Sequence, residues 1–149
     1  LDQLAARPTR PMPTWTFTGA APLLGEGWYV SNAQTVTRAF AGALGSSATA
    51  DADGVYDGVT GQLVTESGTE CSMRLEPGLV GGDAPAPGSL LYTSWTTAGL
   101  FTTVPPTFGS GNYHSLRGKC VDVSSYNPAA PTGSAVRAIF RPVFDFGPV

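Results

Sequence analysis

Four runs of sequence decide the fold: GSLLYT at 88–93, GLFTTV at 99–104, LRGKCVDV at 116–123 and AVRAIFRP at 135–142. Each run is rich in β-branched and aromatic residues, and each is bounded by Gly, Pro, Asn or Ser. Such runs between turn-forming clusters are typical of strands joined by tight connections. We therefore expect the stretch 88–142 to form one small antiparallel barrel.

The closing run alternates between two sets of side chains. The first set is apolar and consists of Val136, Ala138 and Phe140. The second set consists of Arg137, Ile139 and Arg141. A period of two indicates a strand with two different faces. We predict that the apolar set faces the core, that Gly133 allows a tight turn into the strand, and that Arg137 and Arg141 lie at a rim or a partner interface.

The range 14–82 is predicted to be a second β region. Its strand candidates are 15–18, 27–30, 35–40, 55–56, 61–65 and 71–76. The segment 41–54, rich in Ala, Gly and Ser, is expected to be a loop that contributes little to the core. We divide the chain into an arm at 1–13, this N-terminal β region, and a C-terminal barrel module at 88–149. The runs of the two halves follow a loosely similar order, so a duplicated half-barrel and one continuous domain at 14–149 both fit.

The first thirteen residues read as an extended, proline-interrupted arm. Its prolines and arginines are Arg7, Pro8, Arg10, Pro11 and Pro13. Proline removes a backbone donor and holds the preceding residue extended, so this segment is not expected to form a helix or a central strand. Two interpretations stay open: a frayed terminus, or an arm that lies over a neighbouring subunit and binds it through these residues.

Composition favours an all-β protein with no long helix. The 149 residues include 19 Gly and 13 Pro, whereas only 13% are charged. The hydrophobic share of 42% argues for a folded chain. The net charge is −3, and the basic residues are scattered singly, which argues against a nucleic-acid partner. No window approaches the roughly 18 consecutive apolar residues of a membrane span, and the start shows no signal-peptide pattern.

The sequence gives no support for an enzyme, a cofactor or a metal site. His114 is the only histidine, and its pairing with Cys120 would lack an oxyanion-type glycine turn. Asp51, Asp53 and Asp57 lack the remaining ligands of a calcium loop, so we interpret them as turn residues. Cys71 and Cys120 belong to no C-x-x-C motif. We expect both cysteines to be free and buried, with a disulfide as the alternative.

Three of these segments carry a resemblance to a known family. They are GSLLY at 88–92, LRGKCV at 116–121 and GSAVRAIF at 133–140. In order and character they resemble the small β-barrel decoration proteins, or head-stabilising auxiliary proteins, of tailed-bacteriophage capsids. The loop 107–113 is longer than usual there, and Lys119–Cys120 replaces small apolar residues. The resemblance implies a virion structural protein that is assembled in the host cytoplasm and binds the major capsid protein on the capsid surface as a homotrimer.

A second functional hypothesis starts from aromatic residues in predicted loops: Trp95, Phe108, Tyr113 and Tyr126. Exposed rings in loops can stack on sugars, so a carbohydrate-binding or receptor-binding β domain of a phage fibre or a secreted protein is the alternative. The competing interpretation is that these rings cap the open ends of a barrel.

Overall fold

The computed structural model describes residues 14–143 and 148–149. The fold over these residues is all-β, which confirms the predicted class. The strands are β1 (Thr16–Phe17), β2 (Gly27–Asn32), β3 (Thr35–Arg38), β4 (Gly54–Asp57), β5 (Gln62–Val64), β6 (Thr69–Leu75), β7 (Leu90–Thr93), β8 (Phe101–Thr102), β9 (Leu116–Asp122) and β10 (Ser134–Phe140). The helical turns are short: α2 (Ser47–Ala50) and the 3₁₀ turn η1 (Gly81–Asp83).

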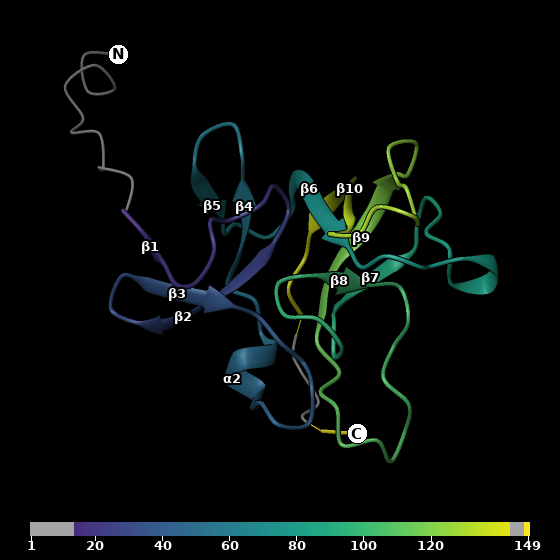
Figure 1. The fold of residues 1–149 in the computed structure, drawn as a ribbon, viewed down its shortest axis with the longest axis horizontal. Coiled ribbons are helices and arrows are strands. Elements are labelled where there is room, and N and C mark those ends of the chain that lie inside the picture. The colour runs from purple at the N-terminus through teal and green to yellow at the C-terminus, as the bar shows by residue number, and fades with distance from the viewer. Residues whose placement is uncertain (1–13, 144–147) are drawn as a thin grey trace.

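The strands form two units that lie side by side (Figure 1). The first is a curled five-stranded sheet in the order β1-β3-β2-β4-β5, and the second is a closed barrel in the order β10-β6-β8-β7-β9. Every barrel strand therefore has a partner on both sides. The curled sheet, in contrast, ends in two edges, β1 and β5.

The barrel differs from the expected one in its fifth strand. We expected 88–142 alone to close, but β6, at Thr69–Leu75, lies between β10 and β8. It pairs antiparallel with all of β10, from Ser134↔Leu75 to Phe140↔Thr69, and parallel with β8 through Leu75↔Phe101. The barrel is thus not wholly antiparallel. β8 has only two residues, and β6, a strand from the N-terminal half, lies between it and β10 and completes the barrel.

The closing strand has the two faces that its alternation predicts. Val136, Ala138 and Phe140 are buried in the main core cluster, with Met73 and Phe101 among their neighbours in that cluster. On the other face Arg137 and Arg141 are exposed and Ile139 is half-buried. Gly133 enters the strand with a φ of +79°, and a Cβ there would collide with the Leu75 carbonyl oxygen. Both the positive φ and the close approach therefore require glycine.

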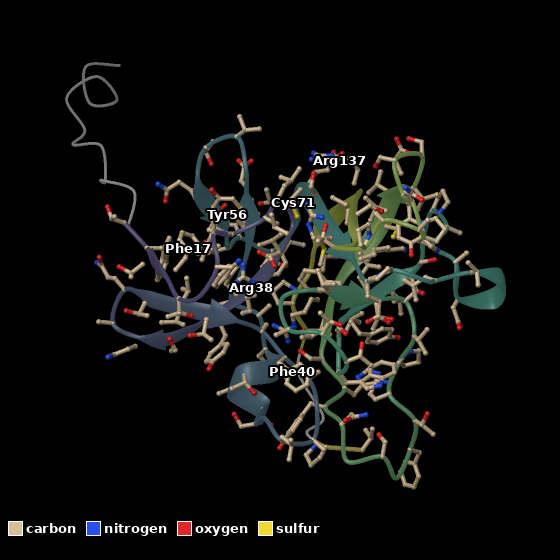
Figure 2. The ribbon with its side chains drawn as sticks, viewed as in Figure 1. Phe17, Arg38, Phe40, Tyr56, Cys71 and Arg137 are labelled. Carbon is tan, nitrogen blue, oxygen red and sulfur yellow. The ribbon has the colours of Figure 1, made fainter. Side chains whose placement is uncertain are left out.

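The curled sheet has a separate and smaller core of aromatic rings. Its fully buried centre is Trp28, packed with Val36 and Leu63. The Phe17 ring meets the Trp28 ring edge-on at 4.9 Å and the Tyr56 ring at 5.3 Å. Figure 2 shows Phe17 and Tyr56 turned toward each other inside this sheet. Because β1 carries Phe17 and β4 carries Tyr56, these contacts hold the sheet in its curled shape.

Backbone hydrogen bonds join the two units at two glycines. The Gly25 N–H donates to the Tyr56 carbonyl at 2.9 Å, and the Arg74 N–H of β6 donates to the Gly25 carbonyl at 2.8 Å. The Gly27 N–H donates to the Gly99 carbonyl at 2.8 Å. A Cβ on Gly25, whose φ is +85°, would lie 2.7 Å from the Arg74 nitrogen. The junction therefore depends on the absence of a side chain at position 25.

The segment 41–54 contributes more to the core than we expected. Ala41, Ala50 and Ala52 are fully buried, and α2 begins with a capping box between Ser46 and Thr49. The Thr93 hydroxyl donates to the Ala50 carbonyl at 2.7 Å in a buried position. Small side chains let this segment pack closely against the barrel, and because it has neither a helical nor a strand period, the sequence pattern did not indicate its burial.

Candidate interaction surfaces

Arg137 lies in a hollow between the two units. Its Nε is 3.3 Å from Glu70 Oε1, and its Nη1 donates to the Ser72 hydroxyl at 3.3 Å. The hollow has a volume of about 220 Å³, and β4 lines it from the curled sheet with Tyr56 and Asp57. Figure 2 shows Arg137 above Cys71, on the side of the barrel that faces the curled sheet. The Arg137 side chain keeps 47% of its surface exposed, so its guanidinium can still bind another molecule.

Arg141 lies on a different side of the barrel. Its backbone N–H donates to the Arg117 carbonyl at 2.9 Å, and its side chain lines a hollow of about 180 Å³ with Lys119 and Val143. Strands β7 and β9 form that hollow, whereas β6 borders the one that contains Arg137. The two arginines predicted to bind a partner are therefore not brought together into one patch. The other predicted partner residues, Arg7, Pro8, Arg10, Pro11 and Pro13, lie outside the described residues.

The most exposed apolar side chains belong to two loops that lie against each other. Leu44 is 100% exposed and Phe108 is 93% exposed. The loops are joined where the Ala43 N–H donates to Asn112 Oδ1 at 3.0 Å and the Tyr113 N–H donates to the Ala41 carbonyl at 2.7 Å. We call the loops 41–45 and 107–113 the apolar end; it lies near the C-terminus of the chain in Figure 1. Both side chains can therefore contact another molecule.

The four loop aromatics have different environments. The Tyr126 ring packs on the barrel core, accepts a hydrogen bond from the Leu79 N–H at 3.2 Å and donates to the Glu76 carbonyl at 3.0 Å. Burial accordingly raises the pKa of Tyr126. Trp95 and Tyr113 are half-buried. Tyr126 thus closes an end of the barrel, and Phe108 has by far the most exposed of the four rings.

The two cysteines are buried free thiols, as predicted. Cys71 on β6 and Cys120 on β9 both pair in register with Ala138, which lies on the strand between them. Strands are about 4.8 Å apart, so the two Cα atoms are separated by about 9–10 Å, beyond the roughly 7 Å that a disulfide can bridge. Burial raises the pKa of each thiol to about 11. Cys120 therefore lacks the lowered pKa that activates a thiol nucleophile.

The aspartates near Gly54 serve the fold. Asp51 Oδ1 accepts a hydrogen bond from the Ser115 hydroxyl at 2.7 Å and pairs with the buried Arg117 guanidinium at 3.2 Å. The Asp53 carboxylate accepts the Val30 N–H at 2.7 Å, and Asp57 caps its own turn by accepting the Val59 N–H at 2.9 Å. Asp57 therefore has the predicted role in a turn, whereas Asp53 binds the backbone of β2 and Asp51 binds side chains that are distant in the sequence. No group of three or more potential metal ligands occurs among residues 14–143 and 148–149.

Sequence reasoning missed the buried Arg117 and the apolar end. Arg117 is buried and pairs with Asp51, a partner that is distant in the sequence and that no local pattern specifies. Leu44 is a single apolar residue within a run of small ones, so no periodicity marked it. Phe108 did carry a signal, since it is an aromatic residue inside a Gly/Ser/Pro loop.

Comparison with known proteins identifies no relative of this chain. Across the described part of the chain, no helix is long and apolar enough to cross a membrane. The sequence matches no protein-family model, and comparison with curated proteins and with solved structures gives no significant match.

Proposed function

We propose that this protein is a virion structural protein that decorates and stabilises a tailed-bacteriophage capsid. It would bind the outer surface of the major capsid protein lattice as a homotrimer, after assembly in the host cytoplasm. The observation that carries this proposal is the position of the three segments that resemble the decoration family. They become β7, β9 and β10, which are consecutive neighbours in the closed barrel. The three segments that resemble the family therefore form one continuous part of the barrel.

The proposed mechanism is adhesion over several subunits. Only 13% of the residues are charged, and exposed ion pairs add little binding energy. The apolar end supplies Leu44 and Phe108 instead. Several weak apolar contacts made by one trimer must break together, so their combined strength exceeds that of each contact alone. Internal pressure from a packaged genome would then have to break many contacts at once.

Co-sedimentation with capsids tests the proposal. The capsids are assembled from the major capsid protein of the same genome, and the mass of the free protein in solution is measured in parallel. We expect a trimer that pellets with expanded capsids, and we expect the double variant Leu44→Ser/Phe108→Ser to bind less. Val80→Ser is the matched control, because Val80 is 61% exposed but lies at the start of η1. A chain that never pellets with capsids contradicts the proposal.

The arm is expected to act in attachment and not in folding. Its arginines and prolines lie outside the described residues, and residues 14–143 already contain both cores. We therefore expect deletion of Leu1–Pro13 to leave the melting temperature unchanged and to weaken co-sedimentation. Full retention of capsid binding by the truncated protein would show that the arm has no role in attachment.

A carbohydrate- or receptor-binding β domain is the second candidate, and the exposed Phe108 ring favours it. Aromatic rings that project from loops can stack on sugar rings. A glycan array probed with the full chain and with Phe108→Ala separates the two functions. Binding to a defined glycan that disappears in Phe108→Ala, without binding to capsids, would replace the decoration proposal.

A further inference from the structure

The curled sheet has an open edge at β1. The Thr16 N–H donates to the Gln34 carbonyl at 2.8 Å, and the Thr18 N–H donates to the Val36 carbonyl at 3.1 Å. Successive residues of a strand point their backbone groups to opposite sides. The N–H and C=O groups of Trp15 and Phe17 therefore point away from β3, toward the open side of β1.

The other edge, β5, is also open. The Tyr56 N–H donates to the Glu26 carbonyl at 2.8 Å, and the Tyr56 carbonyl accepts the Gly25 N–H at 2.9 Å. Both backbone groups of Tyr56 are thus directed away from β5. Tyr56 lies opposite Leu63 in the β4–β5 register, so the two form a non-hydrogen-bonded pair. The N–H and C=O groups of Leu63 consequently point outward from the sheet.

A groove lies between these two edges. Its volume is about 310 Å³, and its lining comprises Trp15 and the segment 62–66, with Thr69. The contact of Phe17 with Tyr56 keeps the β1 edge near the β4–β5 hairpin, as the positions of β1 and β5 in Figure 1 show. Glu66 is acidic, and none of the described residues that line the groove is basic. The groove therefore offers an aromatic wall, two rows of backbone groups and one carboxylate.

We propose that this groove binds the arm of a second copy of the chain, at residues Arg7–Pro13. The segment has the sequence RPTRPMP and carries two arginines, which complement Glu66. Extended proline-containing segments dock in aromatic-lined grooves and along open sheet edges. In an extended arm the backbone groups of Arg10 and Met12 point to one side and those of Arg7 and Thr9 to the other. The arm can therefore offer backbone N–H donors to both edges of the groove, although its prolines have no N–H.

The short connection to Trp15 favours a second copy over the arm's own groove. To enter its own groove, the arm would have to reverse direction just before Trp15. Only Thr14 separates the segment Arg7–Pro13 from Trp15, whereas the tightest common reversal between adjacent strands takes two residues. Seven extended residues span about 22 Å at ~3.1 Å per residue. The arm can thus extend beyond its own sheet, and each copy would donate one arm and receive another.

Cysteine cross-linking in the full chain tests this proposal without any capsid, so its outcome is independent of the proposed function. The variant carries Thr9→Cys and Thr65→Cys; Thr65 lines the groove and is exposed. The native thiols are buried and do not interfere. After mild oxidation we expect covalent dimers and trimers on a non-reducing gel. Thr9→Cys combined with Thr132→Cys is the control, since Thr132 is exposed in the turn before β10.

Two results would overturn the proposal. An intramolecular disulfide, detected as monomers without free surface thiols, would assign the groove to the chain's own arm. Cross-linking no greater than in the Thr132 control would show that the arm does not bind the groove in any copy.

A pair of charge-reversal substitutions provides a second, independent test, in which self-association is measured from the mass of the protein in solution. Glu66→Lys should weaken self-association by about 2- to 5-fold, the range for an exposed ion pair, and adding Arg10→Glu should restore it. Asp83→Lys is the control, because Asp83 is an exposed carboxylate in η1, away from the groove. A protein that is monomeric at every concentration, or a Glu66→Lys effect that Arg10→Glu does not reverse, contradicts the proposal.

Discussion

The barrel and the curled sheet each contain five strands, but the barrel has no edge strand, whereas the curled sheet has two. The barrel is closed, and its core combines side chains from β6 to β10 with Ala39, Ala52 and Val55 from the N-terminal half. The curled sheet leaves β1 and β5 open, and its buried core consists of Trp28, Val36 and Leu63. Open strand edges invite pairing with another chain. The comparison indicates that the barrel provides stability, whereas the curled sheet provides a contact site.

The largest expected effect comes from the barrel core. Phe140→Ala removes a fully buried ring, which should lower the free energy of unfolding by about 3–5 kcal/mol. Typical domains are stable by only about 5–15 kcal/mol, so we expect a much lower melting temperature or poor expression. Phe17→Ala in the half-buried β1 edge should cost less. If the Phe17 variant melts below the Phe140 variant, the two regions have been ranked in the wrong order.

The junction between the two units is tested at Gly25. Gly25→Ala places a side chain at a φ of +85° and 2.7 Å from the Arg74 nitrogen. Gly61→Ala is the matched control, since its φ is +72° and nothing lies within 4 Å of the added Cβ. The control should cost about 1–2 kcal/mol for the left-handed backbone, and Gly25→Ala about 1–3 kcal/mol more for overpacking. Equal losses in chemical denaturation would show that the junction tolerates a side chain.

The buried thiols predict a dependence of stability on pH. The folded-state pKa of Cys71 and of Cys120 is about 11, against 9.0 for an ordinary cysteine. Unfolded chains therefore release these protons first, so the contribution of the thiols is complete below pH 9 and decreases as the pH rises toward about 11. Cys71→Ala/Cys120→Ala should cost about 1–3 kcal/mol at pH 7 and decline less between pH 9 and 11 than the parent protein. A mass increase of two hydrogens on reduction of the purified protein would instead reveal a disulfide.

The smallest effect on folding is expected on the outer face of β10. The Arg137–Glu70 pair has exposed fractions of 47% and 55%, and such pairs contribute about 0–1 kcal/mol. Arg137→Ala and Arg141→Ala should therefore change the melting temperature little and alter assembly more, as read from the oligomer mass. If Arg137→Ala melts as low as Phe140→Ala while the oligomer persists, the faces of β10 have been assigned in reverse.

The local sequence pattern was sufficient to predict which face of a strand is buried, but not which strands pair with each other. The alternation around Phe140 gave the buried face of β10, and the composition gave the all-β class. The pairing of β6 with β10 joins Thr69 to Phe140, and no short-range pattern specifies such a distant partner. The buried alanines at 41, 50 and 52 were missed because a small residue looks the same in a core and in a loop. The groove could not be predicted because it lies between the two edge strands of the curled sheet. The order of the strands in that sheet becomes known only from the structure.

Hydrogen exchange of the full chain, followed at increasing protein concentration, tests most directly whether the barrel is self-sufficient while the curled sheet is completed by another chain. Every residue of β10 pairs in register with β6, so its amides should exchange slowly at all concentrations. The Leu63 amide should exchange quickly in dilute protein and become protected as the concentration rises, because the arm of a second copy then covers it. Leu63 protection that is independent of concentration, or β10 amides that exchange as quickly as Leu63, would contradict the account.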